Sequence, residues 1–139
     1  MKKFKKTSLV SFVIIAVILG LGCSKSIIET NIIIDAMTNG RWIVAQFKEN
    51  NVDCTTQFAA YEFQFENGGT VTAYKTSNST SGIWIADIST RTIFAKFPIS
   101  NDTLKKLNDT WKVYNNTLTL VEANPTDTGR SAYLKLVKK

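Results

Sequence analysis

Apolar and polar side chains alternate along most of the chain from position 41 onward. The segment 61–66 reads YEFQFE, and Asn67-Gly68-Gly69 separates it from a second alternating segment that begins at Val71. A period of two predicts a strand with one buried face, and an Asn-Gly link between two such segments predicts a β-hairpin. The pattern therefore indicates antiparallel β-structure.

Segments of this kind recur often enough to predict eight strands. They cover residues 42–48, 61–66, 71–73, 83–88, 92–97, 111–114, 117–122 and 132–137. Links as short as Asn115-Asn116 and Ser89 to Arg91 can join only antiparallel neighbours. Closing such a meander removes its two exposed edges, so we expect an all-β, eight-stranded, antiparallel up-and-down barrel.

The connections between these strands differ in length. Two are long, residues 50–60 and 98–109, and we expect a helical turn at 104–107 within the second. Two others, residues 77–81 and 123–130, are rich in Ser, Thr, Asn, Gly and Pro, which predicts solvated loops.

A short helix is expected before the first strand. Apolar residues at 28, 32, 33, 36 and 37 recur at spacings near three and four, with Thr30 or Asn31 as N-cap and Gly40 as the stop. This predicts an amphipathic helix over about 32–38 that plugs one end of the barrel. Its apolar face could instead bind a partner.

An interior of eight strands holds its own side chains or one small ligand. The alternation predicts these inward residues: Trp42, Val44, Tyr61, Phe63, Phe65, Trp84, Phe94, Trp111, Leu118, Leu120, Leu134 and Leu136. In two strands the opposite phase remains open, with Ile83 and Ile85 inward instead of Trp84, or Ile93 and Phe97 instead of Phe94.

The N-terminus has the pattern of an export signal. Four lysines precede an apolar segment from Leu9 to Leu21, and Gly22-Cys23 follows. Thirteen residues are fewer than the roughly 20 that a helix needs to cross a bilayer, which favours a signal peptide over a transmembrane anchor.

Leu21-Gly22-Cys23 resembles the lipobox of bacterial lipoproteins, although Gly20 stands where that family usually has Leu. The resemblance implies a signal peptide over 1–22, a lipid on Cys23, a tether over 23–31 and a barrel domain over 32–139. Ser24-Lys25-Ser26 lacks an acidic residue, which by the same resemblance suits the outer membrane, facing the periplasm rather than the cell surface.

Charge argues against nucleic acid as a partner. The whole chain has a net charge of +6, but four of its 17 basic residues lie in the signal segment and its 11 acidic residues do not. The mature chain would be nearly neutral, with no dense basic patch to bind phosphates.

The usual catalytic and metal-binding patterns are missing from the sequence. It contains no His, and Cys54 is the only cysteine besides Cys23, which leaves no disulfide partner and no activating base. Glu62 and Glu66 alternate with aromatic residues and should face solvent. We therefore expect no enzyme activity, no metal and no cofactor.

Gly40-Arg41-Trp42 resembles the G-x-W that opens the first strand of lipocalins. The order of later features, from Val52-Asp53 and Phe58 through the hairpin to Gly82-Ile83-Trp84 and Trp111, is similar to lipocalin-like lipoproteins of Gram-negative bacteria over about residues 39–137. The resemblance implies the barrel fold. Other lipocalin signatures are missing, so it implies no particular transported molecule.

Two functions fit this sequence. The first is binding of a small hydrophobic or amphipathic ligand by aromatic residues in the barrel mouth, with tyrosine hydroxyls or Arg41 orienting it. The candidate ligand-binding residues are Trp42, Tyr61, Phe63, Phe65, Trp84 and Trp111. The second is a filled barrel that serves as an envelope protein-interaction or structural module and docks a partner through loops 50–60 and 98–109.

Overall fold

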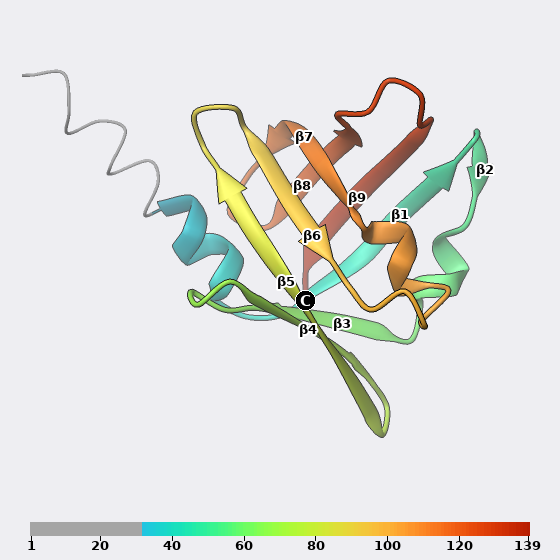
Figure 1. Ribbon diagram of the computed structural model, residues 1–139. Coiled ribbons are helices and arrows are strands. Elements are labelled where there is room, and N and C mark those ends of the chain that lie inside the picture. The colour runs from blue at the N-terminus through green and yellow to red at the C-terminus, as the bar shows by residue number, and fades with distance from the viewer. Residues whose placement is uncertain (1–31) are drawn as a thin grey trace, which may run out of the picture.

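The strands of this protein close into an antiparallel barrel (Figure 1). The computed structural model describes residues 32–139. Its eight barrel strands are β1 (Trp42–Glu49), β3 (Tyr61–Phe65), β4 (Thr70–Lys75), β5 (Asn78–Asp87), β6 (Thr92–Lys96), β7 (Asp109–Asn116), β8 (Leu120–Pro125) and β9 (Ala132–Lys138). From β3 onward each strand pairs with the next one in the chain, and β1 pairs with both β3 and β9. The expected all-β meander barrel is confirmed.

Closure depends mainly on one side of β1. The β1–β9 ladder extends from Trp42 opposite Lys138 to Glu49 opposite Ala132, whereas β1 and β3 meet at a single position, Trp42 opposite Phe63. Beyond that position two short elements cover β1, the added strand β2 (Val52–Asp53) and the 3-10 helix η1 (Thr55–Phe58). The Thr55 hydroxyl accepts a hydrogen bond from the Phe47 backbone amide at 2.9 Å, so the open edge is partly satisfied.

The alternating residues form the core as expected. Trp42, Val44, Tyr61, Phe63, Phe65, Trp84, Trp111, Leu134 and Leu136 are all buried. Trp84 faces inward, and its neighbours Ile83 and Ile85 are 50% and 60% exposed. The predicted phase of this strand is therefore confirmed.

Three of the predicted inward residues are wrong. Phe94 faces outward, because Ile93, Ala95 and Phe97 on the same segment line the interior. Leu118 lies in the turn between β7 and β8 and is 62% exposed. Leu120 begins β8 on the outer face, because Val121 next to it is buried.

Some predicted boundaries are also wrong. Residues 78–81 belong to β5 rather than to a loop, and 123–125 belong to β8. The Asn115-Asn116 pair ends β7 instead of forming the link, which moves the turn to 117–119. A bulge between Val113 and Asn115 shifts the register there, and a bulge is not visible in a pattern of period two.

Short helical segments cover the two ends of the barrel. The helix over 32–38 is confirmed, with Met37 buried and Gly40 at φ +89° beyond its end, while its expected N-cap lies outside the described residues. At the other end, the 3-10 helix η2 (Leu104–Leu107) buries Leu104 and Leu107, as the predicted helical turn requires. Within 32–139 no helix has the length and apolar character to cross a membrane.

Candidate functional site

Side chains fill the interior of the barrel. The space remaining at its centre is about 40 Å³, bordered by Phe63, Phe65 and Trp111 among others. A volume of this size holds at most a few water molecules. A ligand therefore has no room at the centre of the barrel.

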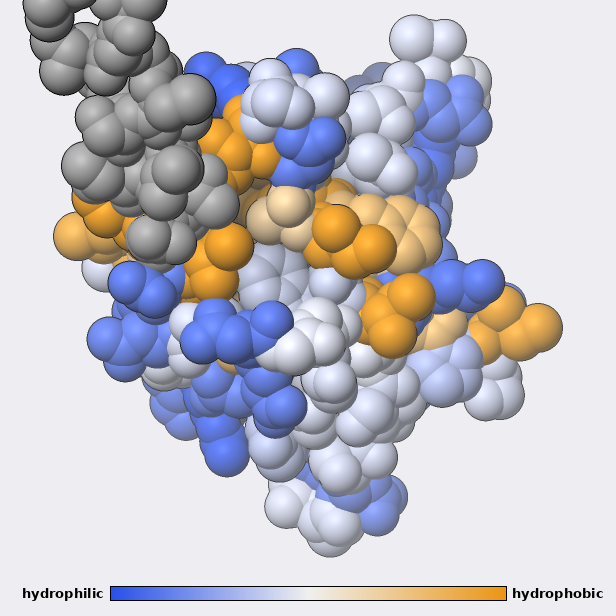
Figure 2. All heavy atoms as spheres, turned by 60° about the vertical axis from the view of Figure 1, so that its left-hand side comes forward, coloured by the Kyte–Doolittle hydropathy of each residue, from blue (hydrophilic) through white to orange (hydrophobic). Residues whose placement is uncertain are grey.

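A larger cavity of about 250 Å³ lies at the end that the helix 32–38 covers. One wall is the apolar face of that helix, with Ile32, Ile33, Ala36 and Met37. The other walls are Trp42, Ala86, Ile88, Ile93, Val113, Leu118 and Val121 from the ends of the barrel strands. Figure 2 shows that apolar side chains also gather on the surface on this side of the molecule. The cavity is apolar in its walls and belongs jointly to the helix and the barrel.

Polar side chains line the rest of the cavity: Asp87, Arg91, Thr92, Asn116 and Thr117. Arg91 lies in the turn between β5 and β6 at φ +53°. This left-handed conformation is unfavourable for any residue other than glycine. Its carbonyl accepts from the Val113 amide at 2.9 Å, which holds the turn against β7. Its guanidinium donates to the Asn116 side-chain oxygen at 3.4 Å and forms no ion pair with any residue in 32–139.

Asp87 is already engaged by its own turn. Its carboxylate accepts from the Ser89 hydroxyl at 2.6 Å and from the Thr90 amide at 3.2 Å, and these hydrogen bonds lower the pKa of Asp87. Both hydrogen bonds end on Oδ1, and they keep the carboxylate ionised. Arg91 is the cation among the lining residues and is placed to meet an anionic end of a bound molecule.

The six predicted ligand-binding residues are not brought to one site. Trp42 borders the 250 Å³ cavity, and Phe63, Phe65 and Trp111 border the small central space. Tyr61 and Trp84 line neither cavity.

The three indoles are also occupied as hydrogen-bond donors. The Nε1 groups of Trp42, Trp84 and Trp111 each donate to a backbone carbonyl at 2.9 Å. Those carbonyls belong to Met37, Glu66 and Leu107 respectively. These side chains therefore hold the fold together, and their N–H groups are not free for a ligand.

Arg41, which the sequence offered as a group to orient a ligand, lines neither cavity. It lies on the outer wall, where it pairs with Glu62 at 2.9 Å and stacks 4.2 Å from the centre of the Tyr74 ring. Sequence reasoning missed Arg91 in its place, because no sequence signal marks an arginine in a left-handed turn. The amphipathic stripe of helix 32–38 was a usable signal, but it was interpreted as a plug rather than as a cavity wall.

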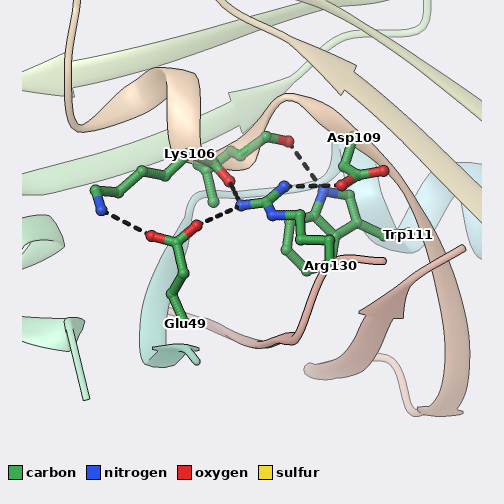
Figure 3. A network of polar contacts seen from close by, with 6 residues as sticks. Glu49, Lys106, Asp109, Trp111 and Arg130 are labelled. Atoms are coloured by element: carbon green, nitrogen blue, oxygen red, sulfur yellow. Dashed lines mark hydrogen bonds and ion pairs between the residues drawn. The ribbon is translucent and has the colours of Figure 1, made fainter. Parts of the chain in front are cut away.

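A polar network closes the opposite end of the barrel (Figure 3). The Arg130 guanidinium pairs with Asp109 at 2.8 Å and Glu49 at 3.2 Å, and donates to the Lys106 carbonyl at 2.6 Å. It also lies 5.4 Å from the centre of the Trp111 ring. Every member has a partner within the network, which indicates a structural role.

The remaining candidates for chemistry are also satisfied. The pKa of Glu49 is lowered, mainly by its hydrogen bond from Lys106, and the pKa of Glu62 is lowered by Lys139 and Arg41. Carboxyl groups of this kind are poor general acids. Cys54 is half-buried at the start of η1 and packs against the core. No group of three potential metal ligands occurs among residues 32–139.

The fold defines a small, eight-stranded antiparallel barrel of the lipocalin-like type, with its cavity at the helix-covered end. Among solved structures it is similar to the crystal structure of a DUF4847 family protein from Bacteroides vulgatus, with a TM-score of 0.57 and 16% sequence identity. The match covers 77% of this chain and 97% of that chain. At this identity the similarity establishes the fold alone.

The sequence comparisons add no family. No protein-family model matches the chain, and no curated protein matches it. Function is therefore inferred from the site.

Proposed function

We propose that this protein is a membrane-anchored lipoprotein that binds a small hydrophobic or amphipathic molecule in the cavity beneath helix 32–38. The observation that carries the proposal is the 250 Å³ apolar cavity in a barrel that is otherwise filled. Its volume is near the lower end of the range for small-molecule sites, which starts at about 300 Å³.

The cavity has the composition of a binding site rather than of an active site. Apolar walls would hold a ring or an acyl segment, and Arg91 and Asn116 at its edge would orient a polar end. Of the ionisable groups that line it, Asp87 is ionised and hydrogen-bonded within its own turn, and Arg91 cannot act as a general base. We therefore propose binding without catalysis and without a cofactor.

The anchor would be a lipid on Cys23, as the lipobox-like segment implies. Each buried methylene contributes about 0.8 kcal/mol, so several acyl chains would hold the domain at a bilayer. The proposed location is the cell envelope, at the outer membrane and facing the periplasm.

Native mass spectrometry of the purified full-length product tests the binding. We expect a copurifying small molecule on the wild type and none on Ala36→Phe, which places a ring inside the cavity. Ala45→Phe is the matched control, because Ala45 is exposed on β1 and its variant should keep the ligand. A wild-type protein with an empty cavity, after gentle purification in several detergents, would overturn the proposal.

Metabolic labelling with a fatty-acid analogue tests the anchor. The wild type should become labelled and Cys23→Ser should not, while Cys54→Ser should be labelled normally. An unlabelled wild type would contradict lipidation and leave the binding proposal to stand on its own test.

A protein-interaction role is the second candidate, and the filled centre of the barrel favours it. Val52 and Ile99, one in each of the two long loops, are 62% and 79% exposed and have polar neighbours. Photo-crosslinking in cells from positions 52 and 99 should then capture one reproducible envelope protein. Crosslinks no more frequent than from exposed Ala45 would count against this role.

A further inference from the structure

We infer that the outer face of β5 and β6 lies against the bilayer to which the chain is anchored. The inference rests on the proposed anchor and adds an orientation to it. The face is defined by an apolar strip, Ile83, Ile85 and Phe94, and by three cations around it, Arg91, Lys96 and Lys112.

The strip consists of neighbours on one surface. Ile85 lies directly opposite Phe94 in the β5–β6 ladder, and Ile83 is two residues away from Ile85 on the same face of β5. Ile83 and Ile85 are 50% and 60% exposed. On the other strands, the alternation places most large apolar residues on the inner face of the barrel. Figure 2 shows apolar side chains as a broken band across this side of the molecule. Phe94 is half-buried, so two mostly exposed isoleucines and part of a ring meet water, which is unfavourable unless another surface covers them.

Three cations surround the strip. Lys96 is opposite Ile83, and Lys112 is opposite Thr92. Neither lysine nor Arg91 pairs with a carboxylate among residues 32–139.

On other strands some cations of the wall are neutralised locally, whereas Lys48, Lys75 and Lys138 form no ion pair among residues 32–139. Arg41 and Lys139 both pair with Glu62, and Lys135 pairs with Glu122. The carboxylate on the β5–β6 face is Asp87, which its turn engages. Anionic lipid headgroups would supply the missing counter-charges.

The position of the tether is compatible with this face. Ile32, at the first described turn of the helix, lines the same cavity as Asp87 and Ile88 at the end of β5. Figure 1 shows the helix beside that end of β5. Cys23 precedes Ile32 by nine residues, and a fully extended chain spans at most about 3.6 Å per residue, or roughly 30 Å. So short a tether keeps the domain close to the bilayer, and the end of β5 lies at the end of the barrel where Ile32 is found.

This orientation has a consequence for the cavity. Its polar edge, with Arg91, would be close to the headgroups, so an amphipathic molecule could pass from the bilayer to the cavity without crossing bulk water. A protein partner on the same strip is the alternative outcome, which the unpaired lysines favour less because a protein would need a matching acidic surface.

Fluorescent labelling on vesicles tests the inference. The full-length product is purified and reconstituted into vesicles of phosphatidylethanolamine and phosphatidylglycerol, with Cys54→Ser as background. An environment-sensitive nitrobenzoxadiazole label is placed at Ile85→Cys, at Phe94→Cys or at the control Ala45→Cys. Ala45 is exposed on β1, which lies across the barrel from β6.

We expect labels at 85 and 94 to shift to shorter emission wavelengths and to react with dithionite several-fold more slowly than the label at 45. Reversing the charges with Lys96→Glu and Lys112→Glu should remove most of this protection. Circular dichroism of each variant confirms that the barrel has formed.

Each outcome separates the two proposals. Equal reactivity at 45, 85 and 94 on vesicle-bound, lipidated protein overturns the orientation and leaves the anchor intact. Protection at 85 and 94 with no lipid on Cys23 in the mass spectrum supports the orientation and overturns the lipid anchor. Protein that does not associate with vesicles overturns both.

Discussion

Gly82 shows how closely single residues are specified in this barrel. It lies on β5 just before Ile83 meets the end of β6. A Cβ atom there would come within 2.5 Å of the Lys96 carbonyl oxygen and 2.8 Å of the Phe97 ring. The absent side chain leaves room for the inward ring of Phe97, which shares its phase with Ile93 and Ala95.

Gly82→Ala should therefore destabilise the protein by about 1–3 kcal/mol, because backbone and a buried ring must both shift. Urea unfolding at equilibrium measures the loss. Gly68→Ala is the matched control, since a Cβ there meets nothing within 4 Å, and it should change the free energy of unfolding little. Equal effects of the two substitutions would contradict this account of Gly82.

Glu49 makes stability depend on pH. Its pKa in the fold is lowered from the ordinary value of 4.5, first by the Lys106 hydrogen bond and also by Arg130, against the opposing effect of burial. A lowered folded pKa gives a stabilisation that is complete above the unfolded value and is lost as the pH falls through the folded value.

Glu49→Gln should cost about 1 kcal/mol at pH 7, the upper end for partly exposed ion pairs. Because the variant has already lost this ionisation, its stability should decline less than that of the wild type between about pH 5 and pH 3. Urea unfolding across this range checks the slope. Parallel pH profiles for the two proteins would show that Glu49 is not responsible.

At the scale of elements, the two ends of the barrel use the same device. At one end the Trp42 indole donates to the Met37 carbonyl in the helix, and Lys138 lies 5.2 Å from the centre of its ring. At the other end the Trp111 indole donates to the Leu107 carbonyl of η2, and Arg130 covers its ring. In both cases one tryptophan joins a helical cover to the sheet and a cation covers the ring.

Trp42→Phe should release the helix 32–38 while the barrel stays closed, because it removes the hydrogen bond but keeps an aromatic ring. The loss is about 1 kcal/mol for a neutral hydrogen bond. Hydrogen exchange should speed up in 32–38 and not in η2, and Trp111→Phe should give the reverse. If either variant loosened both ends equally, the two covers would not be independent.

At the scale of the whole molecule, the barrel closes unevenly. The β1–β9 ladder is nearly full length, and the β1–β3 contact is a single pair. Regions with few paired backbone groups open at lower free-energy cost than the rest.

We therefore expect local opening to begin between β1 and β3. Amides of β3 should exchange faster with deuterium than amides of β9, although both strands neighbour β1. Thr55→Val should widen the difference, because it removes the hydroxyl that accepts from Phe47. Slower exchange in β3 than in β9 would show that the barrel does not open first between β1 and β3.

The sequence was informative about the fold wherever apolar residues alternated strictly. From the segment Tyr61 to Phe65 alone, the strand, its inward-facing residues and the hairpin that follows could all be predicted. Leu118 and Leu120 were wrongly predicted to face inward, because their alternation crosses a turn and a bulge nearby shifts the register. Phe94 was assigned to the wrong face because Ile93 and Ala95 on either side of it are also apolar, so the alternation could not choose between the two phases.

The candidate site was less accessible from the sequence. Its walls come from a helix, Trp42 and the ends of four later strands, which are distant in the chain. Local patterns show that Ile32, Ile33 and Ala36 form an apolar stripe, but only the three-dimensional packing shows that the stripe stops short of the barrel and leaves a space. The aromatic residues proposed as ligand contacts were correctly predicted to face inward, but most of them pack in the core.

The placement of the three tryptophans gives the protein an optical signal of its own. All three indoles are buried, but only Trp42 borders the large cavity. A molecule that enters there would alter the emission of one fluorophore while Trp84 and Trp111 supply a constant background. Occupancy could thus be followed by titration in an unlabelled protein, and Trp84→Phe should keep the signal because Trp84 lines neither cavity.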